Sequence, residues 1–344
     1  MNKKAFTLVE LLAVIVILAI ILAISIPSIS SVIDNSEKSS FVSSTKLLIN
    51  AVKIKLLEDE TFDITTINKS NLKSILNIDD ENYSSISFRY DINGKIYANI
   101  EGQGKWANLV TCGNYENISI TDCIVRDGLI LYLDSSNSNS YPGSGTNWYD
   151  LSGSVNNGTL VNVSYSSSDL GSMVFNGSNS YVSVLPSLLN SSIINSLTIE
   201  CWVKASTASY TVIGGGQDNV GTRYIAAFNV NVLSSNEYGF DIEAVNGQVR
   251  LNSSKDSLQL NVWKHLVGTY NGSVAKFYIN GVLVDTDTGT SGNVVDFDNF
   301  IMGKDIVNIR YFKGDISAYS IYNRELTAQE IVQNFNALRY RYGL

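Results

Sequence analysis

An almost uninterrupted apolar run near the N-terminus constrains this chain more than any other feature. Every residue from Leu11 to Ile24 is apolar. With residues 6–9 included, the run reaches the roughly 20 residues that a helix needs to span a bilayer. Glu10 lies inside the run, where an unpaired carboxylate costs several kcal/mol. The run therefore predicts an exported, membrane-anchored protein in which Glu10 has a partner.

A secretory signal peptide and a plain N-terminal anchor are two simpler interpretations of this run. A signal peptide ends at a small-residue cleavage site followed by a break in the pattern, whereas here the helical pattern continues well past Pro27, which predicts a kink. Beyond that proline, apolar residues recur at helical spacing: Phe41, Leu48, Val52 and Leu56. We expect one helix over residues 6–60, of which 6–26 lie in the membrane or a filament core and the rest lies on a globular head.

The segment from Ala5 to Glu10 (Ala-Phe-Thr-Leu-Val-Glu) resembles the export signal of type IV pilins and pseudopilins. In that family a prepilin peptidase removes a short basic leader, and the new N-terminal residue is usually an N-methylated Phe. A glutamate four residues later pairs with the N-terminal amine of a neighbouring subunit. The resemblance implies a leader at residues 1–5, cleavage between Ala5 and Phe6, methylation of Phe6 and an assembly role for Glu10. Ala5 stands where the family usually has Gly.

The same resemblance implies partners and a location. The partners are the prepilin peptidase and other pilin subunits in a homo- or hetero-oligomeric filament. The protein is expected in the cytoplasmic membrane, as a single-pass protein, before assembly. After assembly it is expected in an extracellular pilus or at the cell surface.

Residues 61–126 predict a small α+β head. Asn93-Gly94 lies between two alternating segments, 87–90 and 96–100, and this dipeptide is a strong hairpin signal. Cys112 and Cys123 are close in sequence, and in an exported protein that spacing favours a disulfide, with two free thiols as the alternative. A loop closed by these cysteines would also resemble the disulfide loop of many pilin heads.

From residue 127 onward, helical periodicity gives way to short strand-like runs that alternate with Asn, Gly and Ser turns. This pattern is typical of an all-β sandwich or barrel. Asn271-Gly272 and Asn280-Gly281 predict a three-stranded meander. Near the C-terminus, Thr327 and Glu330 form a capping box that predicts a final helix.

Short motifs of 127–344 resemble, in order, those of concanavalin A-like, laminin-G-like jelly rolls. They are the segments 148–153, 174–177, 198–203, 263–272, 278–281 and 312–324. The family is a two-sheet sandwich that typically binds glycans or proteins and has some enzymatic relatives. The expected fold is therefore an α+β multidomain chain: a long pilin helix, a small α+β head and an all-β jelly roll.

This resemblance also suggests binding residues. Jelly rolls of this type often hold calcium, which takes several oxygen ligands; Asp150, Asn157 and Asp315 are the candidates, and Ca²⁺ is the one cofactor considered. Aromatic side chains in loops can stack on sugar rings. The candidates for that role are Tyr141, Trp148, Tyr210 and Tyr238.

The residues do not predict an enzyme. Retaining glycosidases need two carboxylates about 5 Å apart, yet Glu200 is the only acidic residue on its expected strand, 197–203. His265 is the only histidine, and no G-x-S-x-G motif accompanies it. We expect both to be structural, and Cys201 to be a buried free thiol.

Charge excludes a further class of partner. The net charge is −8 and no block of Lys or Arg occurs, so nucleic acid is not an expected partner. The leading hypothesis is a minor or tip-located pilin that presents an adhesin- or lectin-like jelly roll to host or matrix glycans or surface proteins. The alternatives are a bulky structural pilin that decorates the fibre and a pilin-anchored surface glycosidase.

Overall fold

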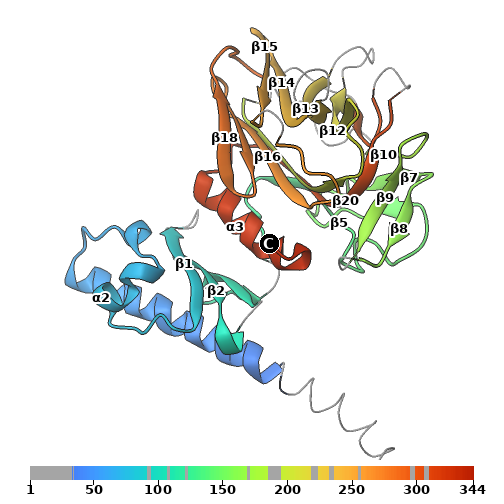
Figure 1. Cartoon of the computed structure of the whole chain (residues 1–344). Coiled ribbons are helices and arrows are strands. Elements are labelled where there is room, and N and C mark those ends of the chain that lie inside the picture. The colour runs from blue at the N-terminus through green and yellow to red at the C-terminus, as the bar shows by residue number, and fades with distance from the viewer. Residues whose placement is uncertain are drawn as a thin grey trace, which may run out of the picture. The chain divides into compact units, whose positions relative to one another are not determined.

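The computed structural model describes residues 33, 35–90, 94–106, 109–120, 123–168, 171–184, 195–217, 224–231, 236–254, 257–294, 299–305 and 310–344. The chain divides into two compact units, Met1–Cys123 and Ile124–Leu344 (Figure 1). The expected leader, the cleavage site at Ala5 and Phe6, Glu10 and the span over 6–26 lie outside the described residues. Within the described part, no helix is both long and apolar enough to cross a membrane.

The first unit combines the long helix, residues 35–58, with a four-stranded antiparallel sheet. The sheet runs in chain order: β1 (Tyr83–Tyr90), β2 (Ile96–Gly102), β3 (Val110–Asn114) and β4 (Ile118–Ile120). The unit also contains four short helices: η1 (Ile64–Thr66), η2 (Lys69–Asn71), α2 (Leu72–Leu76) and η3 (Gly104–Trp106). Tyr90 pairs with Ile96 at the end of the β1–β2 ladder, which confirms the predicted hairpin.

One face of the long helix packs on this sheet. Phe41, Leu48 and Val52 are fully buried, as the apolar spacing predicted. The Phe41 ring lies 5.1 Å from that of Trp106, measured between ring centroids. A disulfide joins Cys112 and Cys123, whose Cα atoms are 5.5 Å apart, so the predicted pairing is confirmed.

Among the described residues, the second unit has two antiparallel sheets of eight strands. We call one the front sheet, in the order β15-β14-β13-β12-β19-β10-β7-β6. Its strands are β6 (Asn147–Trp148), β7 (Gly158–Val161), β10 (Tyr181–Val184), β12 (Thr211–Gln217), β13 (Tyr224–Asn231), β14 (Glu237–Ala244), β15 (Gly247–Asn252) and β19 (Asn299–Met302).

We call the other the back sheet, in the order β18-β17-β16-β11-β20-β9-β8, with β5 also paired to β20. Its strands are β5 (Leu129–Asp134), β8 (Ser164–Ser166), β9 (Ser172–Asn176), β11 (Leu197–Ala205), β16 (Lys264–Tyr270), β17 (Ala275–Ile279), β18 (Val282–Asp287) and β20 (Lys313–Tyr322).

The core of the second unit lies between the two sheets. Phe228 of the front sheet meets Phe277 and Tyr319 of the back sheet, with ring centroids 6.1 and 6.4 Å apart. Gly268 allows a close approach here, because a Cβ at this position would lie 2.4 Å from the ring of Phe240. The arrangement confirms the predicted jelly-roll sandwich.

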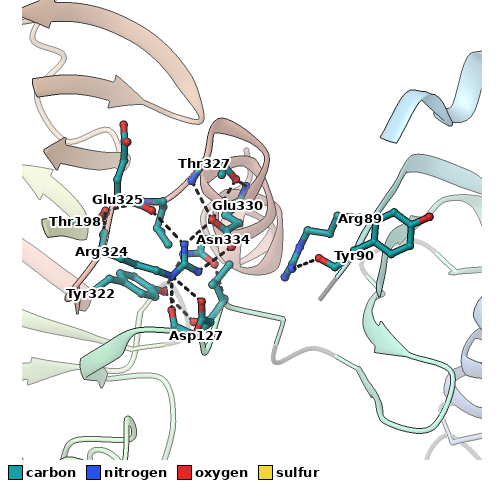
Figure 2. A network of polar contacts seen from close by, with 12 residues as sticks. Arg89, Tyr90, Asp127, Thr198, Tyr322, Arg324, Glu325, Thr327, Glu330 and Asn334 are labelled. Carbon is teal, nitrogen blue, oxygen red and sulfur yellow. Dashed lines mark hydrogen bonds and ion pairs between the residues drawn. The ribbon is translucent and has the colours of Figure 1, made fainter. Parts of the chain in front are cut away.

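A C-terminal helix, α3 (Ala328–Leu338), covers the outer face of the back sheet and leads into η6 (Arg339–Tyr342). Trp202 of β11 stacks on Phe335 of α3 and on Tyr342, with centroids 5.7 and 4.3 Å away. The predicted capping box is present, since Thr327 and Glu330 each accept a hydrogen bond from the other's backbone N–H. Arg324 joins this helix start to Asp127, because it pairs with both Glu330 and Asp127 (Figure 2).

The second unit begins slightly earlier than the sequence suggested, at Ile124 instead of residue 127. Ile124 and Val125 are buried, with 3% and 2% of their surface exposed. The Val125 N–H donates to Asn334 Oδ1 at 2.7 Å, and Tyr322 donates its hydroxyl proton to the Val125 carbonyl at 3.1 Å. These contacts hold the start of the unit against α3 and β20.

Candidate functional site

The outer face of the front sheet carries a concentration of polar side chains. On β14, Tyr238, Phe240 and Ile242 belong to the core. Because side chains alternate along a strand, Asp241 and its neighbours at positions 237, 239 and 243 project from the opposite face. Strand pairing places Asp241 opposite Arg250 of β15. We call the polar face the set Gln217, Asn229, Asp241, Arg250 and Asn252.

The strand register defines a row of residues across this face. Asn229 of β13 and Asn252 of β15 both stand opposite Gly239 of β14. Residues that face each other across neighbouring strands share one side of a sheet. The two asparagines therefore flank Gly239 on the polar face.

Gly239 allows the Asn229 side chain to approach the strand closely. A Cβ there would lie 2.5 Å from Asn229 Oδ1, so the carboxamide of Asn229 reaches over Gly239. The next row repeats the pattern of small residues, because Gly215 pairs with Ala227. Gly215, Ala227 and Gly239 therefore bring no long side chains to this face.

Asp241 and Arg250 form a bidentate ion pair on this face. Arg250 Nε lies 2.5 Å from Asp241 Oδ1, and Nη2 lies 2.7 Å from Oδ2. Asn229 Nδ2 donates to the same Oδ2 at 3.2 Å. Burial raises the pKa of Asp241 above its ordinary value, while Arg250 acts in the opposite direction. The Asp241 side chain is 7% exposed and that of Arg250 41%, so Arg250 is the partner that reaches solvent.

Three carboxamide atoms of the polar face lack a hydrogen-bond partner within the described structure. They are Asn229 Oδ1, Gln217 Nε2 and Asn252 Oδ1. Asn229 is only 1% exposed and Gln217 6%. Buried polar atoms are nearly always paired in native proteins, and each unpaired one costs about 1–3 kcal/mol. The face therefore has hydrogen-bonding capacity that the described residues leave unused.

The four aromatic candidates from the sequence do not form one site. Tyr141, Trp148 and Tyr238 belong to the core, with exposed fractions of 7%, 0% and 1%, so their rings are not available for stacking on a ligand. This corrects the expectation that they are loop residues at the surface. Tyr210 is half-buried. It contacts Arg250, and its ring lies 4.7 Å from Arg310 Cζ, at the border of the polar face.

The calcium candidates do not fit a metal site. Asp150 accepts four hydrogen bonds, from the N–H groups of Tyr132, Ser152 and Asn156 and from the Ser152 hydroxyl. Asn157 Oδ1 accepts from the Asp150 N–H at 2.9 Å, while Asp315 pairs with Lys204 at 2.9 Å. The Asp150 loop is thus a hydrogen-bonded turn. In the described part of the chain, no group of three or more His, Cys, Asp or Glu side chains could hold a metal ion.

Glu200 and His265 lie beneath α3. His265 Nε2 is 2.9 Å from Glu200 Oε1, and Asn334 Nδ2 donates to Glu200 Oε2 at 2.8 Å. His265 is fully buried and Glu200 is 2% exposed. Cys201, the next residue on the strand, is a buried free thiol as expected.

The first unit has a cleft of about 330 Å³ between the long helix and the loops of its sheet. Lys53, Tyr90, Lys95 and Tyr115 are among the residues that line it, and Lys53 Nζ lies 4.7 Å from the centre of the Tyr115 ring. The polar face is the stronger candidate, because it contains buried polar atoms without partners.

Comparison with known families agrees with both parts of the chain. Residues 1–26 match the model of the prokaryotic N-terminal methylation motif, and residues 176–332 match that of the concanavalin A-like lectin/glucanases superfamily. No curated protein matches the chain. The protein therefore carries a prepilin-type N-terminus and a lectin-like jelly roll, and this N-terminus implies a peptidase and other subunits as assembly partners.

The solved structures that match part of this chain include three botulinum neurotoxin binding domains. The receptor-binding domain of the C/D mosaic serotype is 17% identical, with a TM-score of 0.49 over 61% of this chain and 51% of that one. The DC binding domain in complex with rat synaptotagmin II is 20% identical, with a TM-score of 0.49 over 63% and 53%. The serotype G binding domain is 19% identical, with a TM-score of 0.47 over 60% and 50%. The match spans about half the length of each.

Proposed function

We propose that this protein is a minor or tip-located type IV pilin whose jelly roll attaches the pilus to glycans or surface proteins. The observation that carries the proposal is the polar face, where buried carboxamides of Gln217 and Asn229 lack partners. A face of this kind on a chain with a prepilin-type N-terminus combines a means of assembly with a means of binding.

The size of the second unit supports a minor or tip location. The unit Ile124–Leu344 is larger than the whole first unit, Met1–Cys123. A unit of this size on every subunit would crowd the shaft of a densely packed filament. One or a few copies at the tip avoid that crowding and place the polar face where a surface can reach it.

Immunogold electron microscopy with antibodies against the second unit tests the location. We expect gold particles at pilus tips or at sparse positions. Continuous labelling along the shaft would contradict the proposal and favour a bulky structural pilin.

Attachment is tested with cells that carry Asn229→Ala: they should make normal pili and bind less to glycan- or matrix-coated surfaces than wild-type cells.

We also propose that the jelly roll binds without catalysis. Both Asp241 oxygens are held by Arg250, whereas glycoside hydrolysis needs one protonated carboxyl group and one free carboxylate. Glu200 is sealed beneath α3. Release of reducing ends from the glycans that the protein binds would overturn this proposal and favour a pilin-anchored glycosidase.

A further inference from the structure

We infer that the cleft of the first unit binds an acidic saccharide, in which a sugar ring carries a carboxylate. This cleft of about 330 Å³ is lined by residues of the long helix, of the β1–β2 hairpin and of the turn between β3 and β4. The site lies in a different unit from the polar face. It therefore adds a second place of binding and a second class of ligand to the proposed function, and it does not depend on that function.

Basic groups exceed acidic ones at this cleft. Lys53, Lys95 and Glu116 line it, and Lys95 pairs with Glu116. Lys46 is close by, because its Nζ and that of Lys53 lie 5.6 and 4.7 Å from the centre of the Tyr115 ring. Within the described residues, neither Lys46 nor Lys53 forms an ion pair with a carboxylate. In a protein with a net charge of −8, this local positive charge favours an anionic ligand.

Both ammonium groups are available to such a ligand. Lys46 and Lys53 are seven residues apart, or about two helical turns, so they lie on the same side of the long helix. Each contacts the Tyr115 ring, and a cation–π contact at an exposed site contributes only about 0.5–1 kcal/mol. Either group can therefore turn from the ring towards a carboxylate in the cleft at little cost.

Apolar surface accounts for much of the remaining lining. Leu56 and Ile96 line the cleft together with Tyr90 and Tyr115, which are 49% and 38% exposed. Ligand sites of small molecules are clefts of about 300–1,000 Å³ with mostly apolar walls and a few polar groups. A sugar ring presents C–H groups to such walls while its carboxylate pairs with a lysine. An inorganic anion would leave the walls without contacts, so an acidic sugar fits the cleft better.

The wall that carries Tyr115 is held in place before any ligand binds. Asn114 Oδ1 accepts hydrogen bonds from the N–H groups of Glu116 and Asn117, both at 3.1 Å. The ion pair of Glu116 with Lys95 joins this turn to the β1–β2 hairpin. A wall that is already ordered loses little conformational freedom on binding. Because three segments contribute to the cleft, it is short along each of them, which favours a compact ring over an extended peptide.

The test measures the binding of a fluorescein-labelled uronic-acid tetrasaccharide to the full-length protein in detergent, by fluorescence anisotropy. The matched ligand is the same tetrasaccharide with its carboxylates reduced to alcohols. We expect the acidic form to bind at least tenfold more tightly, because only this form can pair with the lysines. High salt should remove most of the difference, since the charges are near the surface.

Variants assign the binding to the cleft. Lys46→Gln with Lys53→Gln should weaken binding of the acidic form about tenfold, the loss expected for two exposed ion pairs. Tyr115→Ala should weaken binding of both forms, whereas Tyr115→Phe keeps the ring and should not. Lys38→Gln with Lys73→Gln is the matched control, because both lysines are exposed and lie outside the cleft. Thermal melting verifies that each variant is folded.

The outcomes separate this site from the polar face. Equal binding of the acidic and the reduced form would overturn the inference, as would tight binding of the acidic form that Lys46→Gln with Lys53→Gln leaves unchanged. Tighter binding of a peptide of four glutamates, lost in the same variant, would assign the cleft to an acidic protein segment and overturn the saccharide. Asn229→Ala should leave binding at the cleft unchanged, so failure of the cleft and failure of the proposed function are distinguishable.

Discussion

Cys201 lies on β11 with its thiol fully buried, next to Glu200. Burial raises the pKa of this thiol well above its ordinary value of 9.0. Burial likewise raises the pKa of the Tyr319 hydroxyl well above 10.0. These groups remain protonated in the folded state at a pH at which the unfolded chain releases their protons. They therefore couple the stability of the sandwich to alkaline pH.

We predict that the free energy of unfolding of the second unit falls as the pH rises above about 9, where the unfolded thiol begins to ionise. In this range the unfolded state binds fewer protons than the folded state, so each such group lowers stability by about 1.4 kcal/mol per pH unit. Cys201→Ala removes one of these groups. Urea denaturation across pH 8–11, with reductant present, should give a shallower slope for this variant.

The slope is the quantity to compare, because Cys201→Ala also leaves a small cavity that lowers stability equally at every pH. Cys112→Ser with Cys123→Ser is the control for general loss of cysteine, since these residues lie in the other unit. Equal slopes for Cys201→Ala and wild type would contradict the prediction.

The surroundings of a single residue can be predicted from the sequence where one strand determines them. Cys201 alternates with its neighbours on an apolar strand, so its burial could be predicted. Tyr141, Trp148 and Tyr238 could not be placed in the same way, because their burial depends on which distant strand covers them. Asn229 cannot be placed from the sequence for a similar reason: its relation to Gly239 and Asn252 arises from the pairing of three strands. The alternation of Phe240, Asp241 and Ile242 was the signal that could have found this face.

Helix α3 is attached to the back sheet by a buried polar side chain as well as by aromatic stacking. Asn334 contacts three separate segments: it accepts from the Val125 N–H and donates to Glu200 Oε2 and to the Tyr322 hydroxyl. We predict that Asn334→Ala destabilises the second unit by about 3 kcal/mol, because each buried group that loses its partner costs about 1–3 kcal/mol.

Denaturant unfolding followed by tryptophan fluorescence measures this effect, since Trp202 stacks on Phe335 of α3. Val332→Ala is the matched control on the same helix, because Val332 is 40% exposed, and it should change stability by less than about 0.5 kcal/mol. If the two variants are equally stable, the polar contacts of Asn334 do not hold the helix.

The long helix of the first unit has a second apolar stripe besides the one on the sheet. Leu47, Ile54 and Leu57 are 67%, 58% and 85% exposed. Exposed apolar residues at helical spacing are typical of an interaction surface. We predict that Leu47→Lys with Ile54→Lys reduces pilus assembly at least tenfold while the first unit stays folded, because charges on this stripe oppose packing against another subunit.

The sheared pilus fraction and the membrane fraction, compared by immunoblotting, measure assembly. Leu47→Met with Ile54→Met is the control, because it changes the same two positions and keeps them apolar, and it should leave assembly unchanged. Normal pilus yield in the double variant would show that the stripe has no role in the fibre.

Elements were predictable where a local signal exists. The Asn280-Gly281 dipeptide predicted the β17–β18 turn, and both residues adopt positive φ angles, 52° and 78°. The capping box predicted the start of α3 for a similar local reason. The order of the front sheet was not predictable, because β19 inserts between β12 and β10 from far along the chain. Such pairings depend on tertiary packing that no short motif encodes.

At the scale of the whole chain, the two units have separate cores. Phe41 and Trp106 belong to the core of the first unit, and Trp148 and Phe240 to that of the second. This division is predictable from the sequence because helical periodicity and strand alternation occupy different parts of the chain. The shift of the boundary to Ile124 arises from the hydrogen bonds of Val125 with Asn334 and Tyr322, which connect positions about 200 residues apart and leave no local signal.

Because the two units have separate cores, we expect reduction of the disulfide to destabilise the first unit and leave the second unchanged. The Cys112–Cys123 disulfide closes a short loop in the first unit, and its loss should destabilise that unit by about 3 kcal/mol. Hydrogen–deuterium exchange of the full-length protein in detergent, with and without reductant, measures this locally. Amides of β3 and β4 should exchange faster after reduction, while those of β11 and β16 should not change, because Cys201 is already a free thiol. Faster exchange in β11 and β16 would mean that the units unfold together, and the sandwich would then depend on the disulfide for its stability.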